Sequence, residues 1–380
     1  MNSGIPREIV TANQAAAAEQ YREFADAVVA PLAAGIDSTE QTPPSLVIRL
    51  AEAGYLGAML PERHGGHGLD RVGYGLLTEQ IGRVCQNTRN LVAVIDMVTH
   101  SISRWGTNEH RDHWLPRIVS GRSVAAFALT EPDVGSDAKS VTTQAREDGA
   151  HLVLTGRKRW ISYAQLAEIF LVFVQYQGKH TAVLIDRDAP GLKVVPITGL
   201  LGLRGSMLGE LILDDVRIPR ESVVGLPGAG LHFVASSALE IGRYSTAWGC
   251  VGLEQACLDA TRSYSASRVQ SGVPIRDHQL VQALIADMVA DVAAARLLCL
   301  SAGLAHAHGS PDTIERTLIA KYFSSRAVNR AASDAVQVHG AQGIGADLPI
   351  QRYYRDAKVL EIIEGTTQLH QSMIGRGVGG

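Results

Sequence analysis

The sequence predicts an α+β fold in which a helical segment, a β segment and a second helical segment follow one another. Residues 15–119 are dominated by Ala, Leu, Glu and Arg. Their interruptions at Pro43-Pro44 and at residues 64–68, which read His-Gly-Gly-His-Gly, are typical of turns between helices. We therefore expect an N-terminal helical domain over residues 1–120.

The composition of the chain changes after Gly121. Short β-branched runs separated by Gly, Asp and Pro predict strands, which are bounded by such punctuation. The runs cover residues 152–154, 169–174, 182–185, 192–197 and 211–218. They predict a central β-sheet or barrel domain over residues 121–228.

Helical periodicity returns after Gly230. Apolar side chains recur at i, i+3 and i+4, which predicts one packed face of a long helix. This stripe consists of Val281, Leu284, Ile285, Met288, Val289 and Val292. We expect a helical bundle over residues 229–380, and disorder only near the ends, at residues 1–19 and 377–380.

Composition narrows the class of protein. The chain has 380 residues, of which 46% are apolar and 19% charged, as in ordinary globular proteins. A formal net charge of −3 gives no sequence-wide basic field, so neither nucleic acid nor a membrane is an expected partner. The four cysteines show no CxxC spacing, and no apolar run reaches membrane-spanning length. With no targeting leader evident, we expect a cytoplasmic protein with buried thiols.

Several familiar motifs are absent. The glycine-rich segment 225–230 has the wrong spacing for a dinucleotide fingerprint and is better explained as a connecting loop. The thirteen histidines include no HExxH pattern, so no metal site is expected. No GxSxG motif supports a serine hydrolase.

Two segments of the β region have chemistry suited to a flavin. Residues 127–137 read Phe-Ala-Leu-Thr-Glu-Pro-Asp-Val-Gly-Ser-Asp, and residues 158–162 read Lys-Arg-Trp-Ile-Ser. A Gly-Ser turn exposes backbone N–H donors, and Trp160 offers a flat apolar surface. Each segment, taken alone, could also be an ordinary turn followed by a strand.

Further segments, taken in order with these two, carry a resemblance to a known family. They are Arg204–Ser206, Glu240–Arg243, Arg268–Gly272, His278-Gln279, Gln337–Gly340, Tyr354–Lys358 and Ile363–Thr366. In this order and at these separations the chain resembles the acyl-CoA dehydrogenase family over nearly its whole length. Within that family it looks most like the acyl-carrier-protein-type dehydrogenases of polyketide and nonribosomal peptide biosynthesis.

The resemblance implies a fold, a cofactor and partners. It implies an N-terminal helical domain, a central β domain and a C-terminal four-helix bundle, in agreement with the periodicity. It also implies FAD as cofactor, an acyl thioester substrate and a homo-oligomer, either a dimer or a tetramer. An electron-transfer flavoprotein is a further candidate partner.

The resemblance also implies which residues bind FAD. The isoalloxazine would be lined by Phe127, Leu129, Thr130, Gly135, Ser136, Trp160 and Ser162. The pyrophosphate and adenosine parts would be held across the subunit boundary by Arg268, Gln279, Gln337, Gly340, Thr366 and Gln368. A guanidinium pairs well with phosphate, although an ordinary surface ion pair is the alternative for Arg268.

Glu364 matches the catalytic base in the family's Glu-Gly-Thr motif. A carboxylate with a solution pKa of about 4.3 becomes a better base near neutral pH when burial raises that pKa. A carboxylate that caps a helix is the alternative interpretation. One subgroup carries its base at the position of Gly242, which has no side chain here, and Glu240 should point elsewhere on its helix. The residues expected near the substrate are Ser136, Glu240, Arg243, Tyr244 and Gly365.

The identity of the thioester is less constrained by sequence. Residues 243–252 and 57–60 resemble the polyketide branch, which suggests a small polar acyl group tethered to a carrier protein. Ordinary acyl-CoA oxidation in fatty or amino acid catabolism is the main alternative. The same base and flavin could also oxidise a carbinol. A flavin oxidase or hydroxylase variant, and a non-catalytic subunit that binds flavin or thioester, remain further alternatives.

Overall fold

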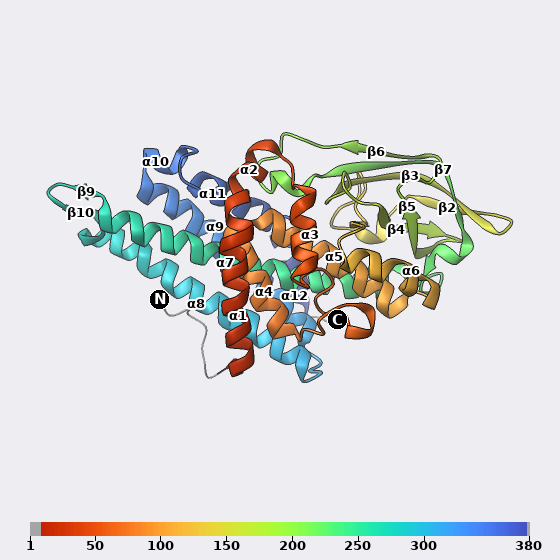
Figure 1. The fold of residues 1–380 in the computed structure, drawn as a ribbon, viewed down its shortest axis with the longest axis horizontal. Helices are drawn as coiled ribbons and strands as arrows, with labels where there is room; N and C mark the ends of the chain where they lie inside the picture. The colour runs from red at the N-terminus through yellow and green to blue at the C-terminus, as the bar shows by residue number, and fades with distance from the viewer. Residues whose placement is uncertain (1–8, 378–380) are drawn as a thin grey trace.

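The computed structural model describes residues 9–377, and its elements follow the predicted order of helices, strands and helices. The N-terminal helices are α1 (Ala12–Phe24), α2 (Ala30–Thr39), α3 (Pro44–Glu52), α4 (Arg71–Val84), α5 (Gln86–Trp105) and α6 (Asn108–Val119). Figure 1 shows α4 and α5 running between α1 and the β region. The fold class predicted from the sequence is confirmed.

The start of the first helix corrects one expectation. Disorder was expected to extend to residue 19, but α1 begins at Ala12. The Thr11 side chain accepts a hydrogen bond from the N–H of Gln14, whose side chain accepts one from the N–H of Thr11. This reciprocal capping box satisfies two free N–H groups at the helix start. Residues 1–8 and 378–380 lie outside the described residues.

The β region forms one mixed sheet. Its strands are β1 (Ala125–Ala128), β2 (Gln144–Asp148), β3 (His151–Ile161), β4 (Ile169–Tyr176), β5 (Lys179–Asp186), β6 (Leu192–Pro196), β7 (Gly209–Pro219) and β8 (Val223–Val224). The strand order is β6-β7-β3-β2-β4-β5-β8, and β1 pairs with β4 in parallel. Strand β4 pairs with three neighbours and is buried along almost its whole length, as a continuous apolar run predicts.

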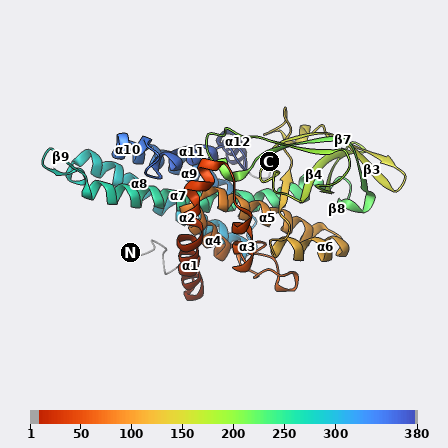
Figure 2. The same cartoon turned by 45° about the horizontal axis from the view of Figure 1, so that its top comes forward.

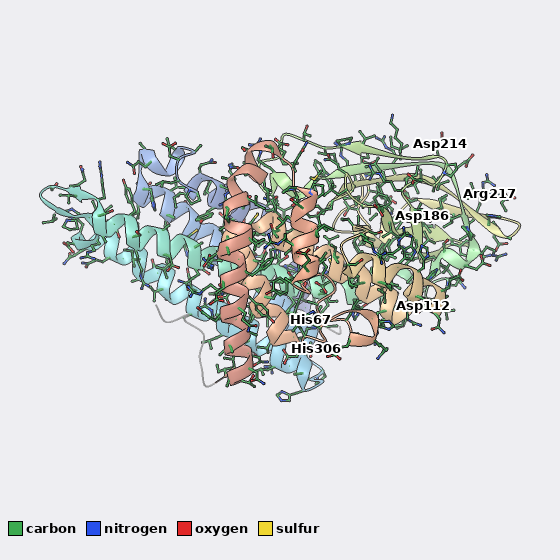
Figure 3. All side chains as sticks on the ribbon, in the orientation of Figure 1. His67, Asp112, Asp186, Asp214, Arg217 and His306 are labelled. Atoms are coloured by element: carbon green, nitrogen blue, oxygen red, sulfur yellow. The ribbon has the colours of Figure 1, made fainter. Side chains whose placement is uncertain are left out.

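Alternating burial along β7 shows how the sheet separates core from solvent. Val216 and Ile218 are buried, whereas Arg217 between them is exposed. Figure 3 labels Asp214 and Arg217 on the outer side of the β region, and His306 on the helical side of the molecule. The buried residues of the strands form a cluster of their own.

The C-terminal region is built on long helices. They are α7 (Ser236–Ser267), α8 (Gln279–Ala307), α9 (Thr313–His339), α10 (Ala341–Ile344), α11 (Ile350–Leu360) and α12 (Thr367–Arg376). Helices α7, α8, α9 and α11 pack together, and α7 also packs against α4 and α5. A hairpin of β9 (Val269–Gln270) and β10 (Val273–Pro274) joins α7 to α8. It lies at the opposite end of the bundle from the sheet (Figures 1 and 2).

Only part of the predicted apolar stripe on α8 is covered. Met288 and Val292 are buried, but Val289 is 40% exposed. Leu280 and Leu297, also on α8, are 84% and 47% exposed. This helix therefore presents apolar side chains that the described chain does not cover.

The cysteines and the helix lengths bear on the remaining expectations. Cys85, Cys250, Cys257 and Cys299 are buried and unpaired, as expected. Over residues 9–377, no helix combines the length and the apolar character needed to span a membrane.

Candidate active site

Glu364 lies in the turn between α11 and α12. Glu364 and Gly365 both adopt positive φ, at 56° and 97°, which is a sparsely populated backbone conformation for a glutamate. The capping residue of α12 is Thr366, whose Oγ1 accepts a hydrogen bond of 3.2 Å from the N–H of Leu369. Glu364 is therefore not the helix cap that the sequence left open as an alternative.

Two basic side chains hold this turn by its carbonyl groups. Arg243 on α7 donates from Nε to the carbonyl of Glu364, at 3.2 Å. Lys321 on α9 is fully buried and donates from Nζ to the carbonyl of Gly365, at 2.8 Å. Since both bonds go to the backbone, they fix the turn while leaving the Glu364 carboxylate free.

The Glu364 carboxylate lies against Gly242. Its Oε2 atom is buried and has no hydrogen-bond partner among the described residues. A Cβ atom added to Gly242 would come within 2.4 Å of that oxygen and within 2.9 Å of the Met97 sulfur. The absence of a side chain at residue 242 is thus what makes room for the carboxylate.

The surroundings of Glu364 make its carboxylate easier to protonate than that of an ordinary glutamate. Burial raises the pKa of Glu364, while Arg243, Arg89 and Lys321 act in the opposite direction without cancelling the rise. Burial also lowers the pKa of Lys321 to about 8. A carboxylate with a raised pKa is suited to accept a proton from a substrate near neutral pH.

A buried ion pair organises residues 127–137, the turn that is predicted to face the flavin (the flavin-facing turn). The Lys158 ammonium donates to the Glu131 carboxylate at 2.8 Å and to the carbonyl of Leu129 at 3.1 Å. Burial opposes ionisation of Glu131, but hydrogen bonds from Lys158, Thr142 and Thr143 outweigh it and hold the pKa at about 2. Burial lowers the pKa of Lys158 to about 8 despite this partner.

The residues predicted to line the isoalloxazine lie on both sides of that ion pair. Phe127 is half-buried at the end of β1, and the N–H of Arg159 donates to the carbonyl of Thr130 at 2.9 Å. Ser162 is half-buried, and its Oγ accepts a 3.2 Å bond from the side chain of Asn90 on α5. The structure therefore brings the two β-region segments together beside α5.

The groups exposed there fit a flavin. Trp160 is 47% exposed and has a φ of 64°, so a strained backbone presents its ring to solvent. Gly135 and Ser136 are exposed, and within residues 9–377 no acceptor bonds their N–H groups. An apolar face beside free N–H donors suits the ring and the carbonyl oxygens of a flavin.

The residues predicted to bind the rest of FAD lie elsewhere. Arg268 ends α7, Gln279 begins α8, and Gln337 and Gly340 end α9. All four are exposed and lie at the hairpin end of the bundle, far from the sheet (Figures 1 and 2). The single chain does not bring them to Trp160. Thr366 and Gln368, in contrast, lie directly after Glu364.

Two residues expected near the substrate face away from Glu364. Glu240 forms an ion pair with Arg71 on α4 and accepts a hydrogen bond from Thr317 on α9. Tyr244 is fully buried, and a Cβ added to Gly303 on α8 would meet its hydroxyl at 2.4 Å. Each lies two residues from Gly242, roughly 200° around α7. Arg243 and Gly365 do adjoin Glu364, whereas Ser136 is exposed on the flavin-facing turn.

Sequence reasoning missed several buried polar groups. Arg89 and Asn90 lie on α5, within a helix whose first turns are buried despite their polar side chains. The signal that could have found them is a guanidinium and an amide directly before the apolar run 91–95. Lys321 gave a similar signal on α9, as a single lysine between buried helical residues.

The fold, with a buried carboxylate on Glu364, is that of a flavin-dependent oxidoreductase. Models of the acyl-CoA dehydrogenase N-terminal, middle and C-terminal domains match residues 11–122, 126–216 and 228–379. The probable acyl-CoA dehydrogenase YngJ of Bacillus subtilis is 34% identical over 374 residues, covering 97% of this chain and 98% of that protein. The chain belongs to the acyl-CoA dehydrogenase family, and its cofactor is FAD.

Two solved structures illustrate the range of the family. A glutaryl-CoA dehydrogenase from Mycobacterium smegmatis in complex with FADH2 superposes with a TM-score of 0.94 at 29% identity, covering 98% of this chain and 96% of that one. FkbI, described as acting in biosynthesis of the methoxymalonyl extender unit of the polyketide Fk520, superposes with a TM-score of 0.85 at 31% identity. That match covers 94% of this chain and 98% of FkbI.

Proposed function

We propose that this chain is an acyl-thioester dehydrogenase in which Glu364 removes the α-proton of the substrate. The observation that carries the proposal is the Glu364 carboxylate: Oε2 is buried, lacks a partner among the described residues, and has a raised pKa. A buried acceptor without a partner is costly, so such an atom is expected where a substrate completes it.

The proposed reaction removes one proton and one hydride from the acyl chain. The α C–H bond breaks and its proton goes to Glu364, while the β-hydrogen leaves with its electron pair, which leaves a trans-2-enoyl thioester. When bound, FAD supplies the acceptor for that hydride. Arg243 and Lys321 keep the base in position through the carbonyl groups of its turn, so the carboxylate is preorganised before substrate binds.

Replacing Glu364 by Gln tests the base. General-base catalysis contributes about 10²- to 10⁴-fold, so the variant should lose at least that much in the rate of flavin reduction. It should retain FAD, because glutamine is close to the same size and the turn is held by backbone bonds. Flavin reduction at the wild-type rate in Glu364→Gln would show that Glu364 is not the base. A wild-type protein that cannot bind FAD would support the non-catalytic alternative.

We propose that the hairpin end of the bundle contacts the FAD bound by a second subunit. The exposed residues Arg268, Gln279 and Gln337 cannot reach the flavin-facing turn of their own chain, but they could contact the flavin of a partner. The uncovered apolar side chains Leu280 and Leu297 on α8 support such a homo-oligomer, because exposed apolar surface favours association. Sedimentation equilibrium tests this, and a monomeric holoenzyme would contradict it.

For the tether of the thioester we propose a carrier protein, with the acyl group belonging to secondary metabolism such as a polyketide extender unit. The resemblance to FkbI supports this proposal. Oxidation of a CoA thioester is the alternative, and the likeness to glutaryl-CoA dehydrogenase supports it.

A comparison of matched CoA and carrier-protein thioesters separates the two tethers. The carrier-protein proposal predicts the higher kcat/KM for the carrier-protein form of the same acyl group. A large preference for the CoA form would overturn it while leaving the role of Glu364 untouched.

A further inference from the structure

The contact between α5 and α7 runs past the base in two directions. Towards the start of α5 it reaches Arg89, which is fully buried. Towards the end of α5 it reaches Trp105, whose half-buried ring lies 5.7 Å from the ring of Phe233, just before α7. Phe233 is 57% exposed. The end at Trp105 is therefore the one that is open to the tether of a substrate.

The distance from the base to this end suits a pantetheine arm. The Met97 sulfur and the Glu364 carboxylate both adjoin Gly242. Trp105 follows Met97 by eight positions on α5, and at about 1.5 Å per residue it lies about 12 Å further along the helix. An extended pantetheine arm is longer than this. The molecule that carries the arm would therefore lie against the protein surface around Trp105.

Three segments of the chain meet at that surface. The N–H of Gly225 donates to the Trp105 carbonyl at 2.9 Å, which fixes the loop after β8 to the end of α5. The N–H of Gly228, in the same loop, donates to the Thr181 hydroxyl on β5 at 3.4 Å. The loop thus joins α5 to the edge of the sheet at β8 (Figure 2).

The side chains exposed at this junction are apolar or basic. Leu226 in the loop is 74% exposed. Arg104 is exposed, and its guanidinium lies 5.1 Å from the centre of the Trp105 ring. Lys179 on β5 is exposed, and its side chain reaches the same loop. The entrance patch is the set of Arg104, Trp105, Lys179, Leu226 and Phe233.

The entrance patch carries positive charge without negative charge to balance it. No Asp or Glu occurs in residues 97–108, 177–185 and 222–239, although 38 of the 380 residues in the chain are acidic. The ion pairs formed in the described part of the chain include neither Arg104 nor Lys179. Free cations of this kind attract an acidic surface and speed its encounter.

The apolar members of the entrance patch distinguish between two anionic carriers of the arm. CoA ends in a phosphorylated nucleotide, which cations alone can hold. A carrier protein holds the arm on a serine and presents carboxylates and apolar side chains from the helix beside it. Exposed apolar side chains rimmed by charged ones are typical of surfaces that bind a protein. Leu226 and Phe233 therefore favour the carrier protein.

We propose that the entrance patch is the docking surface for an acidic carrier protein, which delivers the acyl group on its phosphopantetheine arm. The inference rests on the proposed function, because it takes the thioester to be held at Glu364. Carboxylates of the carrier helix meet Arg104 and Lys179. Apolar side chains of the same helix cover Leu226 and Phe233.

Turnover of one acyl group on three kinds of tether tests the docking surface. The probes are pentanoyl thioesters of pantetheine, of CoA and of three acyl carrier proteins that differ in the number of carboxylates on the helix after the modified serine. For the FAD-loaded wild type, kcat/KM should rise with that number and fall with added salt. Arg104→Glu combined with Lys179→Glu should lower kcat/KM for the carrier forms about 10- to 100-fold, because repulsion replaces attraction. Turnover of the uncharged pantetheine form should not change.

Two single variants sharpen the comparison. Leu226→Ser should lower kcat/KM for the carrier forms about fivefold, as the loss of an interface contact worth about 1 kcal/mol does, and should leave the CoA form unchanged. Lys193→Glu is the matched control, because it reverses an exposed lysine on β6, at the opposite end of the strand order from β8. This control should leave the carrier forms unchanged.

Equal losses for the CoA and carrier forms in the double variant would mean that the entrance patch binds only phosphate, and would overturn the proposal. An equal loss in Lys193→Glu would do the same, since the effect would then not depend on position.

Failure of this inference can be told apart from failure of the proposed function. If the pantetheine and CoA forms reduce the flavin and no carrier form does, the docking surface is wrong and the role of Glu364 stands. If no thioester reduces the flavin, binding of the acylated carrier proteins is measured by calorimetry. Binding that depends on Arg104 and Lys179 would then support the docking surface and contradict the proposed reaction.

Discussion

The two ends of the C-terminal helical bundle differ in whether their polar side chains are hydrogen-bonded within the chain or exposed to solvent. Near Glu364, the side chains of Lys321 and Arg89 are fully buried and held by bonds within the chain. At the hairpin end, Arg268 and Gln279 are exposed. A preorganised reaction centre needs the first arrangement, whereas the second is typical of residues that a partner or ligand covers later.

The largest expected effect is on the buried pair beside the flavin-facing turn. Glu131→Gln leaves the Lys158 ammonium buried without its anion, which should cost about 3–5 kcal/mol in the free energy of unfolding at pH 7. Folding lowers the pKa of Glu131 from 4.5 to about 2. The ion pair therefore adds its full stability at pH values above 4.5, and this stability is lost as pH falls toward 2.

Chemical unfolding at several pH values checks this prediction. The difference in the free energy of unfolding between wild type and Glu131→Gln should shrink as pH falls below about 4.5, the ordinary pKa of this carboxyl group. The exposed pair of Glu147 and Arg220 provides the control, since Glu147→Gln should cost less than about 1 kcal/mol. Equal costs for the two variants would mean that burial does not distinguish these pairs.

A methyl group added at residue 242 tests how closely the Glu364 carboxylate must pack against α7. In Gly242→Ala the new Cβ would lie 2.4 Å from Oε2 of Glu364, so the carboxylate must move. A displacement of about 1 Å in a catalytic group costs on the order of 10²-fold, and the rate of flavin reduction should fall by that factor. Gly249→Ala, about two helical turns further along α7, should reduce it less. An unchanged rate in Gly242→Ala would show that the position of the carboxylate is not critical.

Arg268→Ala tests the hairpin end. If its guanidinium meets a phosphate of FAD, the variant should bind FAD about 10- to 100-fold more weakly, with little change in the rate of flavin reduction once FAD is bound. Fluorescence titration of the apoprotein with FAD measures this. Unchanged affinity would leave Arg268 as a surface residue.

Mixing variants shows whether the two ends act across subunits. Co-expressed Arg268→Ala and Glu364→Gln chains can form a mixed oligomer in which one site has both wild-type residues. At an FAD concentration too low to fill Arg268→Ala alone, and with Glu364→Gln inactive for lack of its carboxylate, the mixture should recover activity. No recovery would argue that each chain uses its own Arg268.

The smallest predicted effect concerns Thr366. As the N-cap of α12 it should contribute about 1 kcal/mol, lost in Thr366→Ala and kept in Thr366→Ser. Thermal unfolding of the FAD-loaded protein measures this. A loss of FAD affinity in Thr366→Ala beyond that destabilisation would support the cofactor contact predicted from the sequence.

Periodicity was enough to predict the order of helices and strands, because the alternation of buried residues in β7 and the spacing along α8 are local properties. The site depends on pairs that are remote in sequence. Arg243 and Glu364 are separated by 121 positions, and Lys158 and Glu131 by 27. No local pattern reports such pairs, so Glu364 was found through a motif, while the partners of its turn were found only in the fold.

Arg89 shows the same limit more sharply. Its place beside polar residues on α5 suggests an exposed helix start, but packing of α5 against α7 buries it completely. Tyr244 is the converse case, a residue that sequence places near the substrate but that the fold turns away. Its neighbour Arg243 adjoins Glu364, whereas the Tyr244 ring lies on the side of α7 that faces α8.

The pH dependence of flavin reduction tests the role of Glu364 most directly. Because burial raises its pKa, the carboxylate is protonated and inactive at low pH and becomes a base as pH rises through that raised value. In anaerobic stopped-flow experiments, the wild-type rate should rise with pH and level off above a pKa higher than the ordinary 4.5 of a glutamate. Glu364→Gln should be slow and lack this rise. A Glu364→Gln enzyme with the wild-type rate and the same pH profile would contradict the assignment of the base.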